Sequence, residues 1–168
     1  MSDELAALTA RLQLLEDLEA IRSSWLDYCN RLDLEDFDAL GDVFCEDASL
    51  EVDGLAASLD GRYEGRESIV GFYRMTETAP DGSSGLMTGH LSTNMQIDLD
   101  GDEATTLAYF FEIVDNNLVL IGTYQHRVRR EPDRWRFASL RISVRFRARL
   151  EADRFAGQTL KEIVARPV

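Results

Sequence analysis

The sequence has no long apolar run and no concentration of positive charge. No uninterrupted apolar stretch approaches the roughly 20 residues that a helix needs to cross a bilayer, so we expect no membrane partner. The 168 residues include 31 acids against 18 lysines and arginines, which gives a formal net charge of -13. Binding to a phosphate backbone requires a basic surface, so we also expect no nucleic-acid partner.

Cysteine is scarce, and the N-terminus lacks the features of a secretory signal. The first residues, MSDELAALTARLQLLEDLEA, are acidic and amphipathic, with neither a basic start nor a continuous apolar core. Cys29 and Cys45 could form a disulfide, but two cysteines in a cytosolic chain are more often reduced core residues. These features predict a cytoplasmic protein, and its length predicts one domain that spans residues 1–168.

Motifs for metal and nucleotide sites are absent too. The chain contains no CxxC, no HExxH and no histidine-rich cluster, which are the usual signs of a zinc site. It contains neither GxGxxG nor the phosphate-binding loop that ends in Gly-Lys-Ser or Gly-Lys-Thr. We therefore expect no metal and no cofactor.

Apolar residues at helical spacing occupy the first half of the chain. Residues 5–28 carry one apolar stripe at spacings of three and four, which predicts a long helix. The stripe could form a coiled-coil seam, but it ends in Trp25 and Tyr28, which suit a groove in a globular protein better. Shorter patterns predict a helix over 37–44, a strand over 49–54, a hairpin or loop over 55–65 and a helix over 66–76.

The hydrophobic period changes from about 3.6 to 2 near residue 87. Four strand-like runs follow at 91–99, 103–114, 118–130 and 134–148, separated by the turn sequences DGD, DNN and EPD. Helices followed by an antiparallel meander predict an α+β fold with helices on one face of a curved sheet. The segment ETAPDGSSG (77–85) is the expected lid, and residues 159–168 are expected to form a short helix or tail.

Alternation along the strands assigns side chains to faces. The first long strand has one polar face, formed by His90, Ser92, Asn94 and Gln96. The fourth has an apolar face that runs from Ala138 to Phe146. Its opposite face begins with aromatic residues and ends in arginines. Such a strand suits either a dimer interface or a ligand pocket.

Blocks spread over nearly the whole chain resemble the SnoaL-like branch of the NTF2-like superfamily. They are LEDLEAIRSSWLDYCNRLDLEDFDALGDVFCEDASLE, GRESIVGFY, GHLSTNMQIDLDGDEAT and GTYQHRVRREPDRWRFASLRISVRF. Within the branch the chain is most similar to scytalone dehydratase and bile-acid 7α-dehydratase. The resemblance implies a cystatin-like cone, in which a strongly curved, mainly antiparallel mixed sheet wraps a long N-terminal helix and shorter helices around one apolar pocket.

The resemblance also implies which residues line that pocket. Dehydratases of this family use an Asp–His pair, which by position falls on Asp33 and His90, with a tyrosine of the long helix at Tyr28. It places three further residues around the ligand: Glu112, Tyr124 and Arg145.

The implied chemistry suits these residue types. Dehydration beside a carbonyl, or isomerisation of an enone, needs a base for a carbon-bound proton and a donor to the enolate oxygen. Histidine titrates near neutral pH, and an aspartate on its other ring nitrogen fixes the tautomer. We therefore expect His90 to act as base and then acid, Asp33 to orient it, and Tyr28 to complete the catalytic set. The expected substrate-binding residues are Tyr124, Arg145, Glu112, Asn94 and Trp25.

Several of these residues have a structural alternative. Asp33 could cap a helix that follows it, and Tyr28 could be an ordinary core residue. Glu112 could face solvent, and Arg145 could pair with one of the many acids. His126 is expected on the sheet surface rather than in the pocket.

The sequence thus predicts a cofactor-independent lyase or isomerase that acts on a hydrophobic cyclic hydroxy-carbonyl compound, such as a polyketide, a steroid or an aromatic degradation product. Two alternatives stay open: a non-catalytic β subunit of an aromatic-ring-hydroxylating dioxygenase, and a small-molecule-binding module. The apolar sheet faces predict self-association as a homodimer or homotrimer.

Overall fold

The computed structural model describes residues 2–77, 89–114 and 118–150. Its elements are α1 (Ser2–Asp33), α2 (Phe37–Leu40), the 3₁₀ turn η1 (Gly41–Val43), β1 (Phe44–Asp53), β2 (Gly61–Glu64), α3 (Arg66–Glu77), β3 (Leu91–Asp100), β4 (Glu103–Val114), β5 (Leu118–Arg130) and β6 (Trp135–Arg149). Apart from Glu77, the expected lid lies outside the described residues, as do the DNN turn and the segment 159–168.

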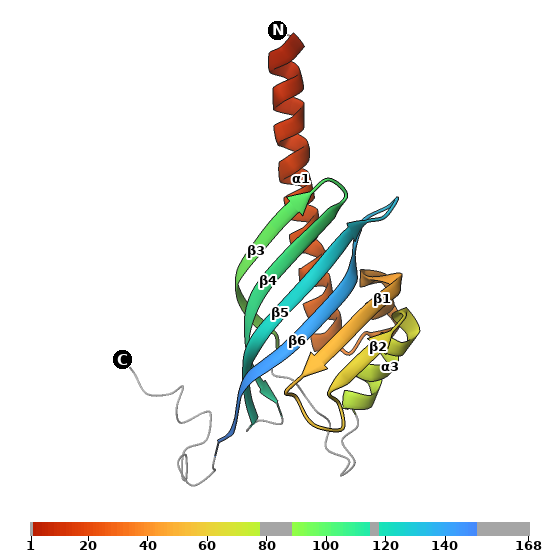
Figure 1. The fold of residues 1–168 in the computed structure, drawn as a ribbon, viewed down its shortest axis with the longest axis vertical. Helices are drawn as coiled ribbons and strands as arrows, with labels where there is room; N and C mark the ends of the chain where they lie inside the picture. The colour runs from red at the N-terminus through yellow and green to blue at the C-terminus, as the bar shows by residue number, and fades with distance from the viewer. Residues whose placement is uncertain (1, 78–88, 115–117, 151–168) are drawn as a thin grey trace, which may run out of the picture.

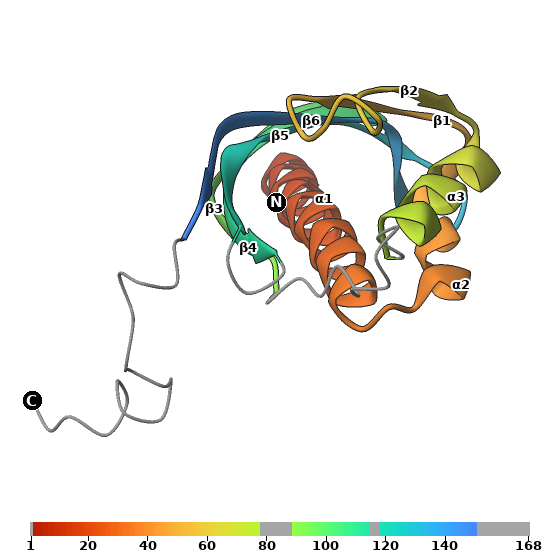
Figure 2. The ribbon, with the colours of Figure 1, turned by 90° about the horizontal axis from the view of Figure 1, so that it is seen from below.

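The six strands form one mixed sheet in the order β2-β1-β6-β5-β4-β3. The β1 and β6 strands run parallel, and the other neighbouring pairs are antiparallel. The sheet is strongly bent, and Figure 2 shows α1 lying in its hollow with α2 and α3 to one side. This is the predicted α+β architecture, with a long N-terminal helix and shorter helices on a curved sheet.

The prediction of a long N-terminal helix is confirmed, but only its second half is buried. Ile21, Trp25 and Tyr28 face the sheet and are almost inaccessible to solvent. The N-terminal half extends beyond the sheet (Figure 1). Four leucines of the predicted stripe are 56–66% exposed there: Leu5, Leu8, Leu12 and Leu15. The stripe therefore does not lie in a groove along its whole length, and self-association through apolar surfaces stays a prediction.

Segment boundaries between α1 and α3 differ from the predicted ones. The expected helix over 37–44 is split into α2 and η1, and β1 already begins at Phe44. The segment expected as a hairpin or loop contains β2, which pairs with β1. Cys29 and Cys45 are both buried free thiols, as expected of reduced core cysteines.

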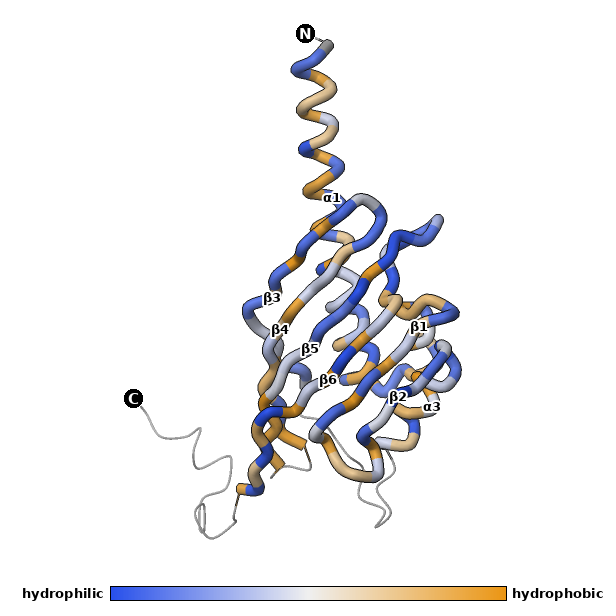
Figure 3. The backbone as a smooth tube through the Cα atoms, in the orientation of Figure 1, coloured by the Kyte–Doolittle hydropathy of each residue, from blue (hydrophilic) through white to orange (hydrophobic). Residues whose placement is uncertain are grey.

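Figure 3 shows hydrophilic and hydrophobic residues alternating along β3, but its register with β4 shifts between Thr93 and Gln96. The predicted shared polar face is therefore wrong: His90 and Ser92 are partly buried, whereas Asn94 and Gln96 are exposed.

Buried and exposed side chains alternate along much of β4 and β5. On β5, Tyr124, His126 and Val128 all point into the hollow and are at most 3% exposed.

Alternation fails on β6, because two extra residues interrupt its pairing with β5. Arg127 pairs with Ser139 but Val128 pairs with Phe137, and Ile121 pairs with Phe146 but Gly122 pairs with Val144. The unpaired residues are Ala138 and Arg145. Each such bulge moves the following side chains to the other face. The predicted apolar face from Ala138 to Phe146 is therefore wrong: Phe137, Leu140 and Ile142 are buried, whereas Phe146 is 52% exposed.

The second bulge depends on a residue without a side chain at position 122. A Cβ there would lie 2.1 Å from the carbonyl oxygen of Ser143 and 2.6 Å from the ring of Phe110. We expect Gly122→Ala to lower the free energy of unfolding by about 1–3 kcal/mol or more, as overpacked core substitutions do. Urea unfolding measures the loss. Gly71→Ala is the matched control, because a Cβ at Gly71 in α3 meets nothing within 4 Å and alanine favours a helix; equal losses for both variants would contradict the steric argument.

Among the described residues, none of the helices combines the length and the apolar character that crossing a bilayer requires.

Candidate active site

The site begins where α1 ends. Backbone N–H groups of Glu35 and Asp36 bond back to carbonyl groups in the last turn of α1, at 3.0 and 2.8 Å, and Glu35 has a left-handed φ of 56°. This hydrogen-bonding pattern terminates a helix. The next helix, α2, is capped by Asp36, whose side chain accepts from the Ala39 N–H at 3.2 Å. The capping role considered for Asp33 is therefore wrong, and its carboxylate is directed elsewhere.

The Asp33 carboxylate holds His90 by both its backbone and its ring. Asp33 Oδ1 lies 2.6 Å from His90 Nδ1. Its two oxygens accept from the His90 N–H at 3.2 and 3.1 Å. The preceding Gly89 has a φ of 114°, a conformation that glycine adopts readily. The His90 side chain is 1% exposed.

These bonds define the charge on Asp33 and the tautomer of His90. Partial burial acts to raise the pKa of Asp33, but the hydrogen bonds from the His90 ring and N–H outweigh it and hold that pKa below its ordinary value. An ionised Asp33 accepts the Nδ1 proton, so Nε2 of neutral His90 is left without a proton. Nε2 points away from Asp33 and can act as a base.

A second carboxylate stands on the other side of the imidazole. Glu112 Oε1 on β4 lies 3.7 Å from His90 Nε2 and accepts the Tyr124 hydroxyl at 2.7 Å. Burial raises the pKa of Glu112, although His90 and Tyr124 oppose the rise. Burial thus favours the neutral form of this carboxyl group. We call Asp33, His90 and Glu112 the carboxylate–imidazole array. Glu112 does not face solvent, being 4% exposed.

A pair of tyrosines lies beside the array. The hydroxyl groups of Tyr28 on α1 and Tyr73 on α3 are 2.7 Å apart, and burial raises the pKa of both. Both phenols therefore keep their protons, and their mutual hydrogen bond uses only one of the two. The other proton can be donated to a ligand oxygen. Sequence reasoning missed Tyr73, which lies beside Phe72 on the buried stripe of α3 and has no other distinguishing signal.

These side chains converge on one cavity of about 250 Å³. Its polar lining includes the carboxylate–imidazole array, both tyrosines and Tyr124, while most of the remaining wall is apolar. The apolar lining residues are Leu32, Phe37, Leu55, Ala56, Leu59, Phe72, Phe110, Val114, Leu118, Leu120, Ile142 and Val144. A cavity of about 150 Å³ holds benzene, and drug-sized ligands occupy about 300–1,000 Å³. This one therefore suits a ligand of one or two rings.

The family description "SnoaL-like domain" matches residues 13–141, which is more than half of the chain. The chain belongs to the SnoaL-like family. No curated protein matches the sequence of this SnoaL-like protein.

Several solved structures have the same fold as this chain. An NTF2-like protein with a cystatin-like fold from Novosphingobium aromaticivorans is 24% identical, with a TM-score of 0.68 over 92% of this chain and 97% of that one. A candidate scytalone dehydratase from the same organism is 20% identical, with a TM-score of 0.67 over 84% and 92%. LinA is 16% identical, with a TM-score of 0.71 over 94% and 99%. The TM-scores show a shared cystatin-like, NTF2-like fold, and at these identities the likeness extends to the fold alone.

Three predicted site residues of this SnoaL-like protein lie outside the cavity lining. Trp25 is buried behind it and stacks on Tyr28 with ring centroids 5.0 Å apart, so it supports the pocket rather than lining it. Asn94 is exposed, with a φ of 55° where the β3–β4 register shifts. Arg145 is also exposed, because it is the extra residue of a β6 bulge. The arginine that lines the cavity is Arg147, which is also an exposed residue.

The expectation that His126 lies on the sheet surface is also wrong. His126 is 2% exposed, and its ring packs against Trp25 and Phe137 with centroids 4.7 and 4.9 Å away. Its Nδ1 is bonded to the Thr106 hydroxyl, and its Nε2 has no partner among the described residues. Burial lowers the pKa of His126 to about 3. His126 is thus a neutral core residue outside the cavity lining.

Within the described residues, no cluster of three or more His, Cys, Asp and Glu side chains is arranged to hold a metal ion. A reaction without metal or cofactor stays a prediction.

Proposed function

We propose that this SnoaL-like protein is a cofactor-independent lyase of the dehydratase type, or an isomerase, that acts on a small hydrophobic cyclic hydroxy-carbonyl compound. The observation that carries the proposal is the carboxylate–imidazole array on the wall of an apolar cavity. Glu112 and the His90 side chain are buried and the Asp33 side chain is partly buried, and burying such polar groups for structural reasons alone is costly. Their convergence on a cavity favours catalysis over a purely structural subunit.

The reaction would begin with removal of a proton from the carbon next to the carbonyl group. His90 Nε2 takes this proton, and the electron pair of the broken C–H bond moves towards the carbonyl oxygen to give an enolate. The ionised Asp33 at Nδ1 stabilises the imidazolium that forms, as the aspartate of a catalytic triad does. Asp33 also keeps the ring from rotating, because it holds the His90 backbone N–H.

The enolate oxygen would be stabilised by the two tyrosines. The phenol proton that the Tyr28–Tyr73 hydrogen bond leaves unused can be donated to this oxygen. Such a bond is stronger in a site that excludes water than in solution. Tyr124, by contrast, donates to Glu112, which makes it a positioning residue for that carboxyl group.

The elimination would end with loss of the hydroxyl group from the next carbon. The enolate electron pair forms the new double bond, the C–O bond breaks, and Glu112 donates the proton that converts the leaving group into water. The raised pKa of Glu112 supports this role as an acid. The imidazolium of His90 then returns its proton to Glu112 across a gap of 3.7 Å. Isomerisation of an enone would share only the first step, after which His90 returns the same proton to another carbon of the enolate and no C–O bond breaks.

The names of two structural relatives are consistent with an elimination. One relative is a candidate scytalone dehydratase, and another is a hexachlorocyclohexane dehydrochlorinase. By their names, the first removes water and the second removes hydrogen chloride. Only the reaction class, an elimination, is carried over from these relatives to this chain, because the two names differ in the leaving group.

The first step can be tested without knowing the substrate. We expect the protein to catalyse exchange of the α-protons of 1-tetralone, a two-ring ketone, for deuterium in D₂O, followed by proton NMR. His90→Gln should lower the rate by at least about 100-fold, because positioned general bases typically contribute 10²–10⁴. A panel of cyclic β-hydroxy ketones, monitored for enone absorbance, then identifies the leaving group.

His126→Phe is the matched control, since it removes the other histidine of the chain without touching the cavity. It should exchange 1-tetralone at the wild-type rate. Equal exchange rates for the wild type and His90→Gln would contradict the proposal. Co-purification with an iron-bearing α subunit, together with absent exchange, would favour the dioxygenase-subunit alternative.

A further inference from the structure

Arg147 gives the cavity a positive charge at one side. Among the described residues that line the cavity, it is the only lysine or arginine. Its Nη1 donates to the Leu55 carbonyl oxygen at 2.8 Å, which ties the β1–β2 connection to β6. A guanidinium has five N–H donors, and a neutral carbonyl group does not compensate its charge. No carboxylate of the described residues forms an ion pair with Arg147, although the β6 residue Arg141 pairs with Glu51 at 3.5 Å.

The sheet register places Arg147 opposite the acidic side of the cavity. Glu112 on β4 pairs with Leu120 on β5, and Leu120 pairs with Arg147 on β6. Side chains of directly paired residues share a face of the sheet. Neighbouring strands lie about 4.8 Å apart, so the backbones at Glu112 and Arg147 are separated by about 10 Å. A ring that rests on Leu120 would have the array at one end and the guanidinium at the other.

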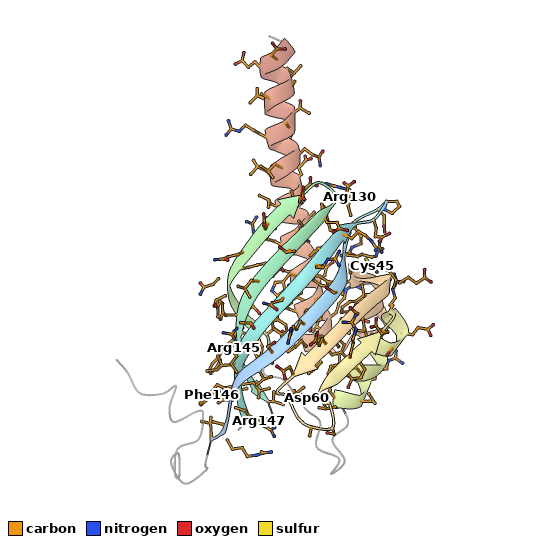
Figure 4. All side chains as sticks on the ribbon, in the orientation of Figure 1. Cys45, Asp60, Arg130, Arg145, Phe146 and Arg147 are labelled. Atoms are coloured by element: carbon orange, nitrogen blue, oxygen red, sulfur yellow. The ribbon has the colours of Figure 1, made fainter. Side chains whose placement is uncertain are left out.

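The surrounding charge strengthens this polarity. The chain as a whole has a formal net charge of -13, which repels anions, yet the end of β6 reads Arg145, Arg147 and Arg149. Figure 4 shows Arg145 and Arg147 near this end of the strand. Local positive charge at the edge of an apolar cavity steers an anion towards it and fixes its orientation.

We propose that Arg147 binds a carboxylate, or an equivalent anionic group, of the substrate. The substrates are then anionic one- or two-ring compounds whose acidic group lies about one ring away from the reacting carbon. This inference rests on the proposed function for the identity of the reacting end, but not for the binding of the anion. It makes Arg147 the residue that distinguishes acidic substrates from neutral ones of the same shape.

Binding of two unreactive ligands tests the proposal. 2-Naphthoate and 2-naphthamide have nearly the same shape and differ in charge, and neither carries a leaving group. Titration calorimetry at pH 7 should show naphthoate binding to the wild type about tenfold more tightly than naphthamide, the size expected of one charge-assisted hydrogen-bonded pair. Arg147→Met should abolish this preference. Arg147→Lys, which keeps the charge but not the planar fork, should retain part of it.

Arg145→Met is the matched control, because it removes an arginine two positions away on an exposed bulge. It should keep the tenfold preference. The ratio of the two affinities separates charge recognition from any loosening at Leu55, which would weaken both ligands alike. His90→Gln should also keep the preference, so failure of the elimination chemistry would not be mistaken for failure of this inference.

Three results would overturn the inference. They are an absence of naphthoate binding to the wild type, an equal affinity for both ligands, and a preference that survives in Arg147→Met. A preference lost equally in Arg145→Met would show general attraction by the end of β6 instead of a site at Arg147, and would overturn it as well.

Discussion

Asp33→Asn should lower turnover by about 10³–10⁴-fold while leaving the protein folded, the size of loss that follows when a catalytic histidine is held in the wrong tautomer. The His90 N–H lies within reach of both Asp33 oxygens, whereas only Oδ1 lies 2.6 Å from Nδ1. An asparagine must offer its carbonyl oxygen to this N–H, which turns its amide group towards Nδ1. The amide then donates to Nδ1, the ring proton moves to Nε2, and the base is lost.

Two measurements check this prediction together. The rate of α-proton exchange or turnover gives the loss, and ¹⁵N NMR of the imidazole should show the proton moving from Nδ1 to Nε2. Asp36→Asn is the matched control, because Asp36 caps α2 and asparagine caps helices equally well. Asp36→Asn should leave both observables unchanged. A fully active Asp33→Asn variant would mean that the ring orientation of His90 does not matter.

The second large effect is a loss of stability in acid that comes from His126. Its pKa is about 3 in the folded protein and about 6.5 in an unfolded chain. Between these values the unfolded chain binds a proton that the folded protein does not, so stability is complete above pH 6.5 and falls as the pH is lowered. The slope approaches about 1.4 kcal/mol for each pH unit, and the whole window amounts to about 5 kcal/mol.

Urea unfolding between pH 7 and 4.5 measures this slope. His126→Phe combined with Thr106→Val should remove the His126 contribution, since phenylalanine fits between Trp25 and Phe137 and valine removes the hydroxyl that would lose its partner. The raised pKa of Glu112 acts in the opposite direction in both proteins, so the contribution of His126 is the difference between the two slopes. The depressed pKa of Asp33 acts at lower pH, because an unfolded aspartate titrates near 3.9. An unchanged slope in the double variant would assign the acid sensitivity to other groups.

The sequence predicts the elements of this fold better than it predicts the faces of β6. Period and turn residues locate α1, α3 and the last four strands, although the apolar pattern does not match burial in the first half of α1 or along the whole of β6. The bulges at Ala138 and Arg145 arise from pairing with β5, which is a non-local property. Buried residues change from odd positions at Trp135 and Phe137 to even positions at Leu140 and Ile142, but which residue is the extra one depends on the partner strand. The resemblance places Arg145 in the pocket by position, whereas the arginine on the cavity lining is Arg147.

The sequence likewise predicts only some of the residues of the candidate site. Five of the residues that the resemblance places around one pocket line the cavity: Tyr28, Asp33, His90, Glu112 and Tyr124. Their catalytic roles stay predictions. Tyr73 and the burial of His126 could not be foreseen, because they depend on how α3 and α1 pack against the sheet. The exposed leucines of α1 could not be foreseen either, since a stripe does not reveal where its partner surface ends.

The parallel pairing of β1 with β6 determines how late in synthesis this protein can fold. Phe44 pairs with Phe137, and Val52 pairs with Ile142, so the sheet closes only between segments about 90 residues apart in the chain. The hollow that receives Trp25 and Tyr28 is also walled by Phe137. At a synthesis rate of about 5–20 residues per second, the apolar side of α1 waits several seconds or longer for β6 to leave the ribosome. Folding dominated by such distant contacts is slow, so α1, which carries Tyr28 and Asp33 of the site, lacks its partner surface throughout that interval.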